Sequence, residues 1–305
     1  MAPPFRKPPA APPTWISEKI WKEIEATGTD AFLVAHSPSL RLERWGYTLR
    51  AFATQSDPLA CEESMLGPPT GFPWKPTRVI WQSEGEKTAH HLFGEGWTTE
   101  VKELNLRYGI DLTPGTAPGL FPDQRENRVY LRARGPTSLL NLFAHTCAFG
   151  VLAAAEGAAT LNIDTSARAL ERGRENYRRN RLTDSDHRFW KEDVRKVLPR
   201  LLRRGETFSA IILDPPTFAH GGRGRAFRIE RELESMLAAC LRLLAPGGCL
   251  LVSINESHTQ RWELERMARS ALSTEKIRAR LEPSRRPVEV PETRMPAGIW
   301  VLRED

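Results

Sequence analysis

Residues 138–164 read SLLNLFAHTCAFGVLAAAEGAATLNID, and they show the architecture of the chain most clearly. An apolar run at 138–143 leads through a short turn into the small-residue segment 151–159, and a second apolar run follows at 160–164. Apolar runs without polar alternation are typical of strands that are buried on both faces. The stretch therefore predicts a strand, a helix and a second, parallel strand of an α/β sheet.

Apolar runs of the same kind continue toward the C-terminus, at 187–192, 208–213, 248–254, 276–281 and 298–302. Helical periods separate the first six runs, as in a parallel sheet that is covered on both faces. The connection EPSRRPVEVPETRMP contains four prolines, which disfavour a crossover helix. We therefore expect a Rossmann-like α/β sheet of seven strands whose last strand is antiparallel.

The chain before this sheet has a different texture. Residues 1–13 are rich in proline and predict a disordered, extended tail. Residues 14–27 place apolar side chains on one helical stripe that ends at Gly28, and short runs bounded by Gly, Pro and Ser follow up to about residue 113. We expect domains at 14–115, a helix with a smaller β-rich domain, and at 116–305.

Composition excludes several classes of protein. With 40% hydrophobic and 27% charged residues, the chain is globular, and no apolar run is long enough for a membrane helix. The N-terminus has prolines where a signal peptide needs an apolar core, so we expect a cytoplasmic protein. The four cysteines have no metal-ligand spacing, which predicts free thiols and no metal site. The net charge of +6 permits a nucleic-acid partner but does not identify one.

The turn after the first strand of this sheet is a candidate ligand site. In a doubly wound sheet, a nucleotide-like ligand lies at the carboxyl end of the strands. Asp164 ends the second strand, where its carboxylate can accept hydrogen bonds from ribose hydroxyls. The alternative is that Asp164 only caps the following helix. The turn lacks a G-x-G-x-x-G pattern, which disfavours a dinucleotide.

Residues 214–218, DPPTF, end the fourth strand of the sheet and carry the most chemistry. Two prolines extend the backbone and remove two amide donors, so nearby carbonyls can accept from a substrate. Asp214 adds a further acceptor, and Phe218 adds a ring on which a planar base can stack. The alternative is a rigid turn with a buried phenylalanine. The pattern favours a site for a planar, nitrogen-bearing base.

Six segments together resemble a known family: GLFPDQRENR, LLNLFAHTCAFG, NIDTSARAL, KEDV, DPPTF and LLAPGG. They are similar to class I S-adenosylmethionine-dependent methyltransferases, specifically the ribosomal RNA large-subunit methyltransferase branch. The similarity covers about residues 117–260. It implies a Rossmann-like methyltransferase sheet, S-adenosyl-L-methionine as cofactor and RNA as substrate.

The resemblance also implies roles for individual residues. The cofactor pocket would be bordered by Gln124 and Arg125. Its methionine end would be shaped by Phe143, Ala144, Thr146 and Phe149. The ribose would be held by Asp164, and the adenine amine by Asp193. The methyl acceptor would be held by Asp214, Pro215, Pro216 and Phe218.

The chain departs from this family at two places. Cys147 stands where family members have a glycine, and a cysteine in a positive-φ turn costs about 1 kcal/mol and is expected to crowd the sulfonium. Relatives that methylate cytosine C5 use a cysteine after the fifth strand, where this chain reads Ser253-Ile254-Asn255. Cys249 lies at the start of that strand and is interpreted as a buried hydrophobe. A nitrogen acceptor needs no thiol, so we expect methylation of a base nitrogen.

Two basic segments are candidate RNA contacts. The loop after DPPTF contains Arg223 and Arg225, which either bind phosphates or belong to a solvated loop. The arginines of residues 166–182 favour a solvated face, because glutamates supply pairing partners. The sequence thus predicts an RNA methyltransferase. The alternatives are a methyltransferase of a small molecule or protein side chain, and a non-catalytic RNA-binding protein of the same fold.

Overall fold

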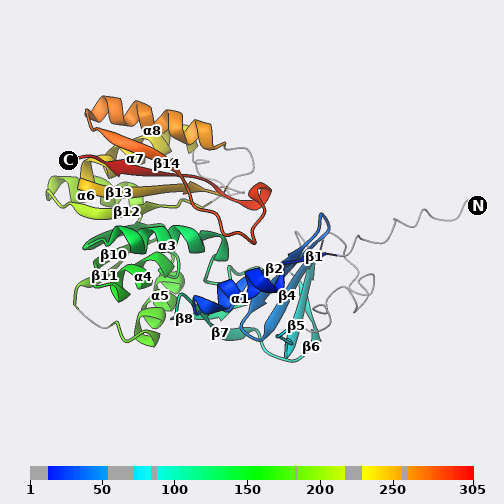
Figure 1. Cartoon of the computed structure of the whole chain (residues 1–305). Helices are drawn as coiled ribbons and strands as arrows, with labels where there is room; N and C mark the ends of the chain where they lie inside the picture. The colour runs from blue at the N-terminus through cyan, green and yellow to red at the C-terminus, as the bar shows by residue number, and fades with distance from the viewer. Residues whose placement is uncertain (1–12, 54–71, 84–87, 183–184, 217–228, 256–259) are drawn as a thin grey trace, which may run out of the picture. The chain divides into compact units, whose positions relative to one another are not determined.

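The computed structural model describes residues 13–53, 72–83, 88–182, 185–216, 229–255 and 260–305. It divides the chain into two compact units, residues 1–122 and 123–305. The sequence-based boundary at 115/116 falls slightly before this division. The described strands of the first unit form two sheets, and those of the second unit form one (Figure 1).

In its described residues, the first unit contains one helix and mostly antiparallel strands. Its elements are β1 (Thr14–Trp15), α1 (Glu18–Ala26), β2 (Ala31–His36), β3 (Leu40–Trp45), β4 (Thr48–Ala53), β5 (Arg78–Ser83), β6 (Ala89–Phe93), β7 (Thr98–Glu103) and β8 (Leu106–Asp111). Strands β1 to β6 form one sheet in sequence order, and β7 pairs with β8. This confirms the smaller β-rich domain.

The N-terminal helix is shorter than its apolar stripe predicts. Thr14 and Trp15 pair with β2 as a strand, and the helix begins only after Ser17, whose side chain accepts a hydrogen bond from the Ile20 amide. The backbone of residues 14 and 15 is thus satisfied by the sheet instead of by a helix. Trp21 and Ile24 of the stripe are buried, as the periodicity predicted.

The second unit alternates strands and helices. Its elements are α3 (Arg125–Arg134), β9 (Ser138–Leu142), α4 (Ala148–Ala155), β10 (Ala159–Asp164), α5 (Ala167–Arg179), β11 (His187–Lys191), α6 (Val194–Arg203), β12 (Phe208–Leu213), α7 (Ile229–Leu243), β13 (Leu244–Ile254), α8 (Arg261–Glu275), β14 (Ala279–Pro283) and β15 (Ala297–Arg303). Short 3-10 helices, η2 (Pro122–Gln124) and η3 (Glu292–Arg294), precede α3 and β15.

The seven strands of this unit lie in the order β11-β10-β9-β12-β13-β15-β14. Strand β15 is antiparallel to both of its neighbours, whereas the pairs from β11 to β13 are parallel. Helix α4 packs against α3 and α5, and α7 packs against α6 and α8, so two groups of helices flank the sheet (Figure 1). The predicted seven-stranded sheet with an antiparallel last strand is confirmed.

Two strand boundaries differ from the prediction by three residues or more. Strand β13 begins at Leu244, because residues before the glycines already pair with β12. Strand β14 begins at Ala279, because α8 continues to Glu275 and Lys276 ends it in a left-handed conformation. A helix end of this kind is often a glycine, so lysine gave no local signal.

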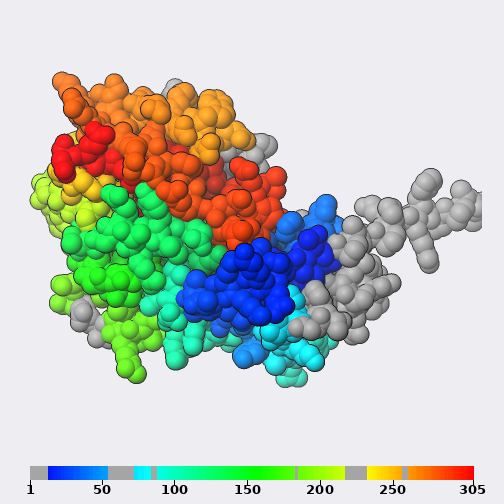
Figure 2. Space-filling model, viewed as in Figure 1, coloured from blue at the N-terminus to red at the C-terminus, as the bar shows by residue number. Residues whose placement is uncertain are grey.

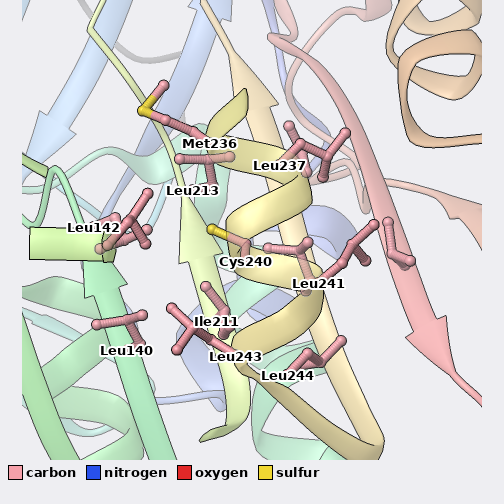
Figure 3. Packing of buried hydrophobic residues seen from close by; sticks show 14 of the residues in the cluster. Leu140, Leu142, Ile211, Leu213, Met236, Leu237, Cys240, Leu241, Leu243 and Leu244 are labelled. Atoms are coloured by element: carbon pink, nitrogen blue, oxygen red, sulfur yellow. The ribbon is translucent and has the colours of Figure 1, made fainter. Parts of the chain in front are cut away.

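The core explains why the strands can carry a rigid site. Leu237, Cys240 and Leu241 on α7 belong to one buried cluster with Leu142 of β9 and Leu213 of β12, and Cys240 points toward β12 (Figure 3). These side chains are buried, and close packing of this kind resists displacement. The strand ends are therefore held in fixed register.

Candidate active site

The carboxyl ends of the central strands bring the candidate residues to one edge of the sheet. Leu142 on β9 pairs with Ile163 on β10 and with Leu213 on β12. The residues that follow them, Phe143, Asp164 and Asp214, therefore begin the loops on three neighbouring strands, which are spaced about 4.8 Å apart. From β9 the next strands along the chain are added on one side, and from β12 they are added on the other, so the strand order reverses between these two parallel strands. Such a switch point is where ligands bind in open α/β sheets.

The turn after β9 has an unusual backbone. Phe143, His145 and Cys147 have φ values of 57°, 47° and 63°, a region that residues other than glycine rarely occupy. Two backbone bonds hold the turn: the Ala144 amide donates to the Ile163 carbonyl at 2.9 Å, and the Cys147 amide donates to the Ala144 carbonyl at 2.7 Å. The turn is thus attached to β10 and leads directly into α4.

The four side chains that were expected to shape the methionine end differ in exposure. Phe143 is partly exposed and packs against the core, whereas Ala144, Thr146 and Phe149 are buried. The ring of Phe149 lies 5.3 Å from the guanidinium carbon of the buried Arg128, a cation–π contact. Ala144, Thr146 and Phe149 are therefore enclosed within this unit.

The backbone of Cys147 is in the left-handed conformation, as expected for a residue that stands where family members have a glycine. Its side chain is buried and lies against α5, and the expected crowding of the sulfonium stays a prediction. A Cβ built on Gly173 of α5 would lie 2.5 Å from Cys147 Sγ, so the thiol fills the space that this glycine leaves. Burial raises the pKa of the Cys147 thiol, which keeps it protonated.

Asp164 joins the turn to the next helix. One carboxylate oxygen accepts from the His145 amide at 2.8 Å, and the other accepts from the Ser166 amide at 2.8 Å. Ser166, and not Asp164, is the N-cap of α5. Each oxygen of Asp164 retains acceptor capacity, because a carboxylate offers about four lone-pair sites. A diol can therefore still bind to it.

Asp193 follows β11 and caps α6, where its side chain accepts from the Arg195 amide at 2.9 Å. The Arg195 guanidinium also contacts this carboxylate, and that pairing holds the pKa of Asp193 below its ordinary value. The side chain is thus fixed and ionised at the same sheet edge as Asp164. An ionised acceptor in this place suits an amine.

Asp214 lies between polar and charged groups at the end of β12. Leu213 pairs with Val252, so Asp214 stands beside Ser253 of β13, whose hydroxyl donates to its carboxylate. The pKa of Asp214 is raised to about 7, and burial is the largest cause. The Ser253 hydroxyl and Arg128 lower this pKa, whereas the Asp123 carboxylate raises it. Near neutral pH, this carboxyl therefore exchanges a proton readily.

The remaining residues of the DPPTF segment are only partly described. Pro215 is buried and Pro216 is exposed. Phe218, Arg223 and Arg225 lie outside the described residues, as does Cys61, and their expected roles stay predictions.

Gln124 and Arg125, which were expected to border the cofactor pocket, have buried side chains that bind other parts of this unit. Gln124 donates from Nε2 to Ser253 Oγ at 2.9 Å. Arg125 makes a two-pronged ion pair with Glu289, with distances of 2.6 and 2.9 Å, and these residues are 3% and 4% exposed. Gln124 thus connects the start of α3 to β13, and Arg125 connects α3 to the segment between β14 and β15.

The described cysteines are not placed as nucleophiles. Cys147, Cys240 and Cys249 are free and buried. Burial raises the pKa of Cys249 to about 11, and its pairing with Ala210 places it away from the carboxyl end of β13. The interpretation of Cys249 as a buried hydrophobe agrees with this position.

Neither a metal cluster nor a membrane span is found in the part of the chain that the structure describes. No group of three or more His, Cys, Asp or Glu side chains there could hold a metal ion. No described helix is both long and apolar enough to cross a membrane.

Sequence reasoning missed Ser253, Asn127 and Glu289. Their signal is weak because each is a single polar residue whose partner is far away along the chain. The alignment of Ser253 with Asp214 could have been found only from the register of two strands that are separated by a helix.

Known proteins share both the sequence pattern and the fold. A family model described as S-adenosylmethionine-dependent methyltransferase matches residues 81–303. Curated relatives include the ribosomal RNA large subunit methyltransferase I of Shewanella denitrificans, 37% identical, and that of Aeromonas salmonicida, 34% identical, each over 153 residues. Each match covers 50% of this chain and only 38% of the relative.

Solved structures show the same fold at low identity. The SAM-dependent methyltransferase from Agrobacterium tumefaciens has a TM-score of 0.71 and 21% identity, and the alignment covers 92% of this chain and 91% of that chain. SMU.776, solved in complex with SAH, has a TM-score of 0.76 and 19% identity, with coverage of 95% and 83%. Since the family model matches most of the sequence, and the sheet has the strand order described above, the chain belongs to the S-adenosylmethionine-dependent methyltransferase family.

Proposed function

We propose that this chain transfers the methyl group of S-adenosylmethionine to a nitrogen of an RNA base, with ribosomal RNA as the substrate and the cytoplasm as the place of action. The observation that carries the choice of nitrogen is the Asp214 carboxyl, which stands at the switch point of the sheet with its pKa raised to about 7. The names of the curated relatives support ribosomal RNA.

The residues at the sheet edge fit the cofactor. S-adenosylmethionine carries a ribose diol and an adenine amine, both of which donate hydrogen bonds, and Asp164 and Asp193 offer carboxylate acceptors on adjacent strands. The Cys147 thiol is directed at Gly173. When bound, the cofactor supplies an electrophilic methyl group on a sulfonium.

The chemistry of Asp214 suits a nitrogen that bears a hydrogen. Its carboxylate accepts the N–H of the base, which orients the nitrogen lone pair toward the methyl group. As the nitrogen–carbon bond forms, the carbon–sulfur bond breaks and its electron pair stays on sulfur. The nitrogen then loses its proton to Asp214. A pKa near 7 lets this carboxyl accept that proton and release it to water.

A test of this function begins with the product. Purified chain, S-adenosylmethionine and unmodified large-subunit rRNA are expected to yield an N-methylated nucleoside, identified by mass spectrometry after digestion. No covalent complex is expected with 5-fluorocytosine-substituted RNA, because a direct displacement needs no enzyme nucleophile. A trapped adduct that disappears in Cys249→Ser would instead show attack on a pyrimidine carbon.

Asp164→Ala is expected to weaken S-adenosylmethionine binding by about 10- to 150-fold, since it removes charged hydrogen bonds worth about 1.5–3 kcal/mol. Isothermal titration calorimetry measures this loss. Asp186→Ala is the control. Asp186 is exposed and precedes β11 at the amino end of the strands, so it lies away from the carboxyl end where the cofactor is expected. Equal affinity in wild type and Asp164→Ala would remove Asp164 from the cofactor site.

Support for an RNA partner comes from helix α8, which lies at the surface of the second unit (Figure 2, orange). Trp262 is 61% exposed, and Arg266 and Arg269 are exposed at positions four and seven residues later, on the same helical face. Exposed tryptophan with arginine suits single-stranded nucleic acid, because bases stack on the ring and phosphates pair with the guanidinium groups. A cavity of about 410 Å³ beside α8, lined by residues including Arg261 and Arg286, opens at the start of β15.

Trp262→Ala is therefore expected to weaken RNA binding by about 1–3 kcal/mol, roughly 5- to 150-fold, through lost stacking. Fluorescence anisotropy with a labelled rRNA fragment measures the change. Replacing both Arg266 and Arg269 by Ala is expected to lower the log–log salt slope by about 1.5 to 2. S-adenosylmethionine affinity serves as the internal control and is expected to stay unchanged. Wild-type RNA affinity in Trp262→Ala would exclude this surface.

The α5 arginines give less support for an RNA surface. Glu171 pairs with Arg174 and Arg178 at 3.2 and 2.8 Å, and Glu175 pairs with Arg179 at 3.4 Å. These ion pairs agree with the interpretation of a solvated face. Methylation of a small molecule or protein would leave Trp262 without a role, and the position of the Cys147 thiol gives no support to a non-catalytic protein.

A further inference from the structure

The side chain of Asn127, on α3, has its orientation fixed by two groups that can only donate. Its Oδ1 atom accepts from the Trp300 indole N–H at 3.0 Å and from the Arg285 backbone amide at 2.7 Å. An indole nitrogen and a backbone amide are never acceptors in such contacts, so the oxygen of the Asn127 amide must face them. The Asn127 nitrogen therefore points the other way. Asn127 is 1% exposed, so bulk water does not compete for these hydrogen bonds.

That orientation is passed on to Gln124 and Ser253. Asn127 Nδ2 donates to Gln124 Oε1 at 2.8 Å, which turns Gln124 Nε2 toward Ser253 Oγ at 2.9 Å. The Ser253 oxygen thus accepts from Gln124, and its single proton remains available to another acceptor. Ser253 stands beside Asp214 across the β12–β13 pair, and its hydroxyl donates to the Asp214 carboxylate.

We propose that this buried series of hydrogen bonds, from Trp300 through Asn127 and Gln124 to Ser253, is a positioning device that aims the Ser253 hydroxyl at one oxygen of Asp214 and leaves the other oxygen as the acceptor for the substrate N–H. The inference rests on the proposed function only for the identity of the substrate. Gln124 and Ser253 are then positioning residues for methyl transfer, because they act through Asp214.

The charges around Asp214 explain why such a device matters. Burial and the neighbouring Asp123 carboxylate favour the protonated form, in which Asp214 could not accept from a substrate. Arg128 and the Ser253 hydroxyl favour the ionised form. Arg128 belongs to α3 and Ser253 to β13, so two elements oppose the effect of burial. Ser253 is the group among them that bonds directly to Asp214.

The test is a carboxyl-carbon NMR titration of the full chain labelled with 13C at aspartate, in which Asp214 is assigned by its loss in Asp214→Asn. In Ser253→Ala, the apparent pKa of Asp214 is expected to rise by about one pH unit, because a hydrogen bond to the charged form is lost. Ser253→Thr retains a hydroxyl and is expected to restore the wild-type value. Gln124→Met removes the donor that orients Ser253 and is expected to give a smaller rise.

Ser209→Ala is the matched control, because Ser209 also bridges neighbouring strands but at the amino end of β12. It is expected to leave the Asp214 titration unchanged even if the variant is less stable. An unchanged Asp214 pKa in Ser253→Ala would overturn the inference. An unchanged Asp214 pKa in Gln124→Met would show that Gln124 and Asn127 do not orient the Ser253 hydroxyl.

Activity separates this inference from the proposed function. If both hold, the acid limb of the kcat–pH profile moves upward in Ser253→Ala, and kcat at pH 7 falls about fivefold while KM for S-adenosylmethionine stays the same. If the NMR shifts occur but wild-type enzyme methylates no RNA, the positioning device stands and the proposed substrate is wrong.

Discussion

Asp214→Asn is expected to lower kcat by about 100- to 10,000-fold, the range that a general base contributes. In the variant, the Ser253 hydroxyl donates to Asn Oδ1, so the amide nitrogen faces the substrate. An N–H donor then meets the N–H of the base, and the neutral amide cannot take the proton. S-adenosylmethionine affinity is expected to change less than kcat, which single-turnover assays and calorimetry together reveal.

The same variant is expected to be more stable than wild type at alkaline pH. Because the folded-state pKa of Asp214, about 7, lies above its ordinary value of 3.8, the folded protein loses stability as pH rises from about 4 to about 7. Asparagine removes that loss. The gain in the free energy of unfolding is absent below pH 4 and reaches about 2–4 kcal/mol above pH 7. The lower figure is favoured because Asp214 is partly exposed and solvent screens its charge.

Urea unfolding at pH 4 and pH 8.5 checks this prediction. Asp186→Asn, at the amino end of the strands, is the matched control and is expected to show no such pH-dependent gain. A variant that gained equal stability at both pH values would show that the charge of Asp214 is not the cause. Full activity in Asp214→Asn would exclude Asp214 as the acceptor.

Glu289→Ala is expected to destabilise the protein by about 3–5 kcal/mol, because it leaves the Arg125 guanidinium buried without its two-pronged partner. This is a large fraction of the stability of an ordinary domain. Glu289 lies in the connection between β14 and β15, so its loss also releases that connection from α3. Urea denaturation of the full chain measures the change.

A double replacement separates the charge from the packing. Arg125→Met combined with Glu289→Leu substitutes apolar side chains for both partners, and it is expected to recover most of the lost stability, since no fully buried charge is left unpaired and Glu126, which loses its contact with Arg125, is partly exposed. Glu292→Ala is a control in the same connection, where the side chain is exposed, and is expected to change stability by less than about 0.5 kcal/mol. A double variant as unstable as Glu289→Ala would contradict the assigned role of the ion pair.

The sheet and its strand ends could be predicted because their signals are local. Strands buried on both faces, such as 208–213, are largely apolar, and the helices between them have their own period. The four prolines of residues 282–296, three of which lie between β14 and β15, indicated the antiparallel last strand before any pairing was known. Asp164 and Asp214 could be placed at one edge because the ends of parallel strands coincide.

The sequence by itself therefore determined the sheet, the edge at which the site lies and the carboxylates that stand there. Only the tertiary structure determined what those carboxylates contact. Gln124 meets Ser253 across 129 positions, and Asn127 meets Trp300 across 173 positions, so no short pattern records these bonds. The space that the Cys147 thiol fills likewise exists because Gly173, on α5, has no side chain. Such contacts follow from strand register and helix packing, which bring together residues whose distance along the chain is arbitrary.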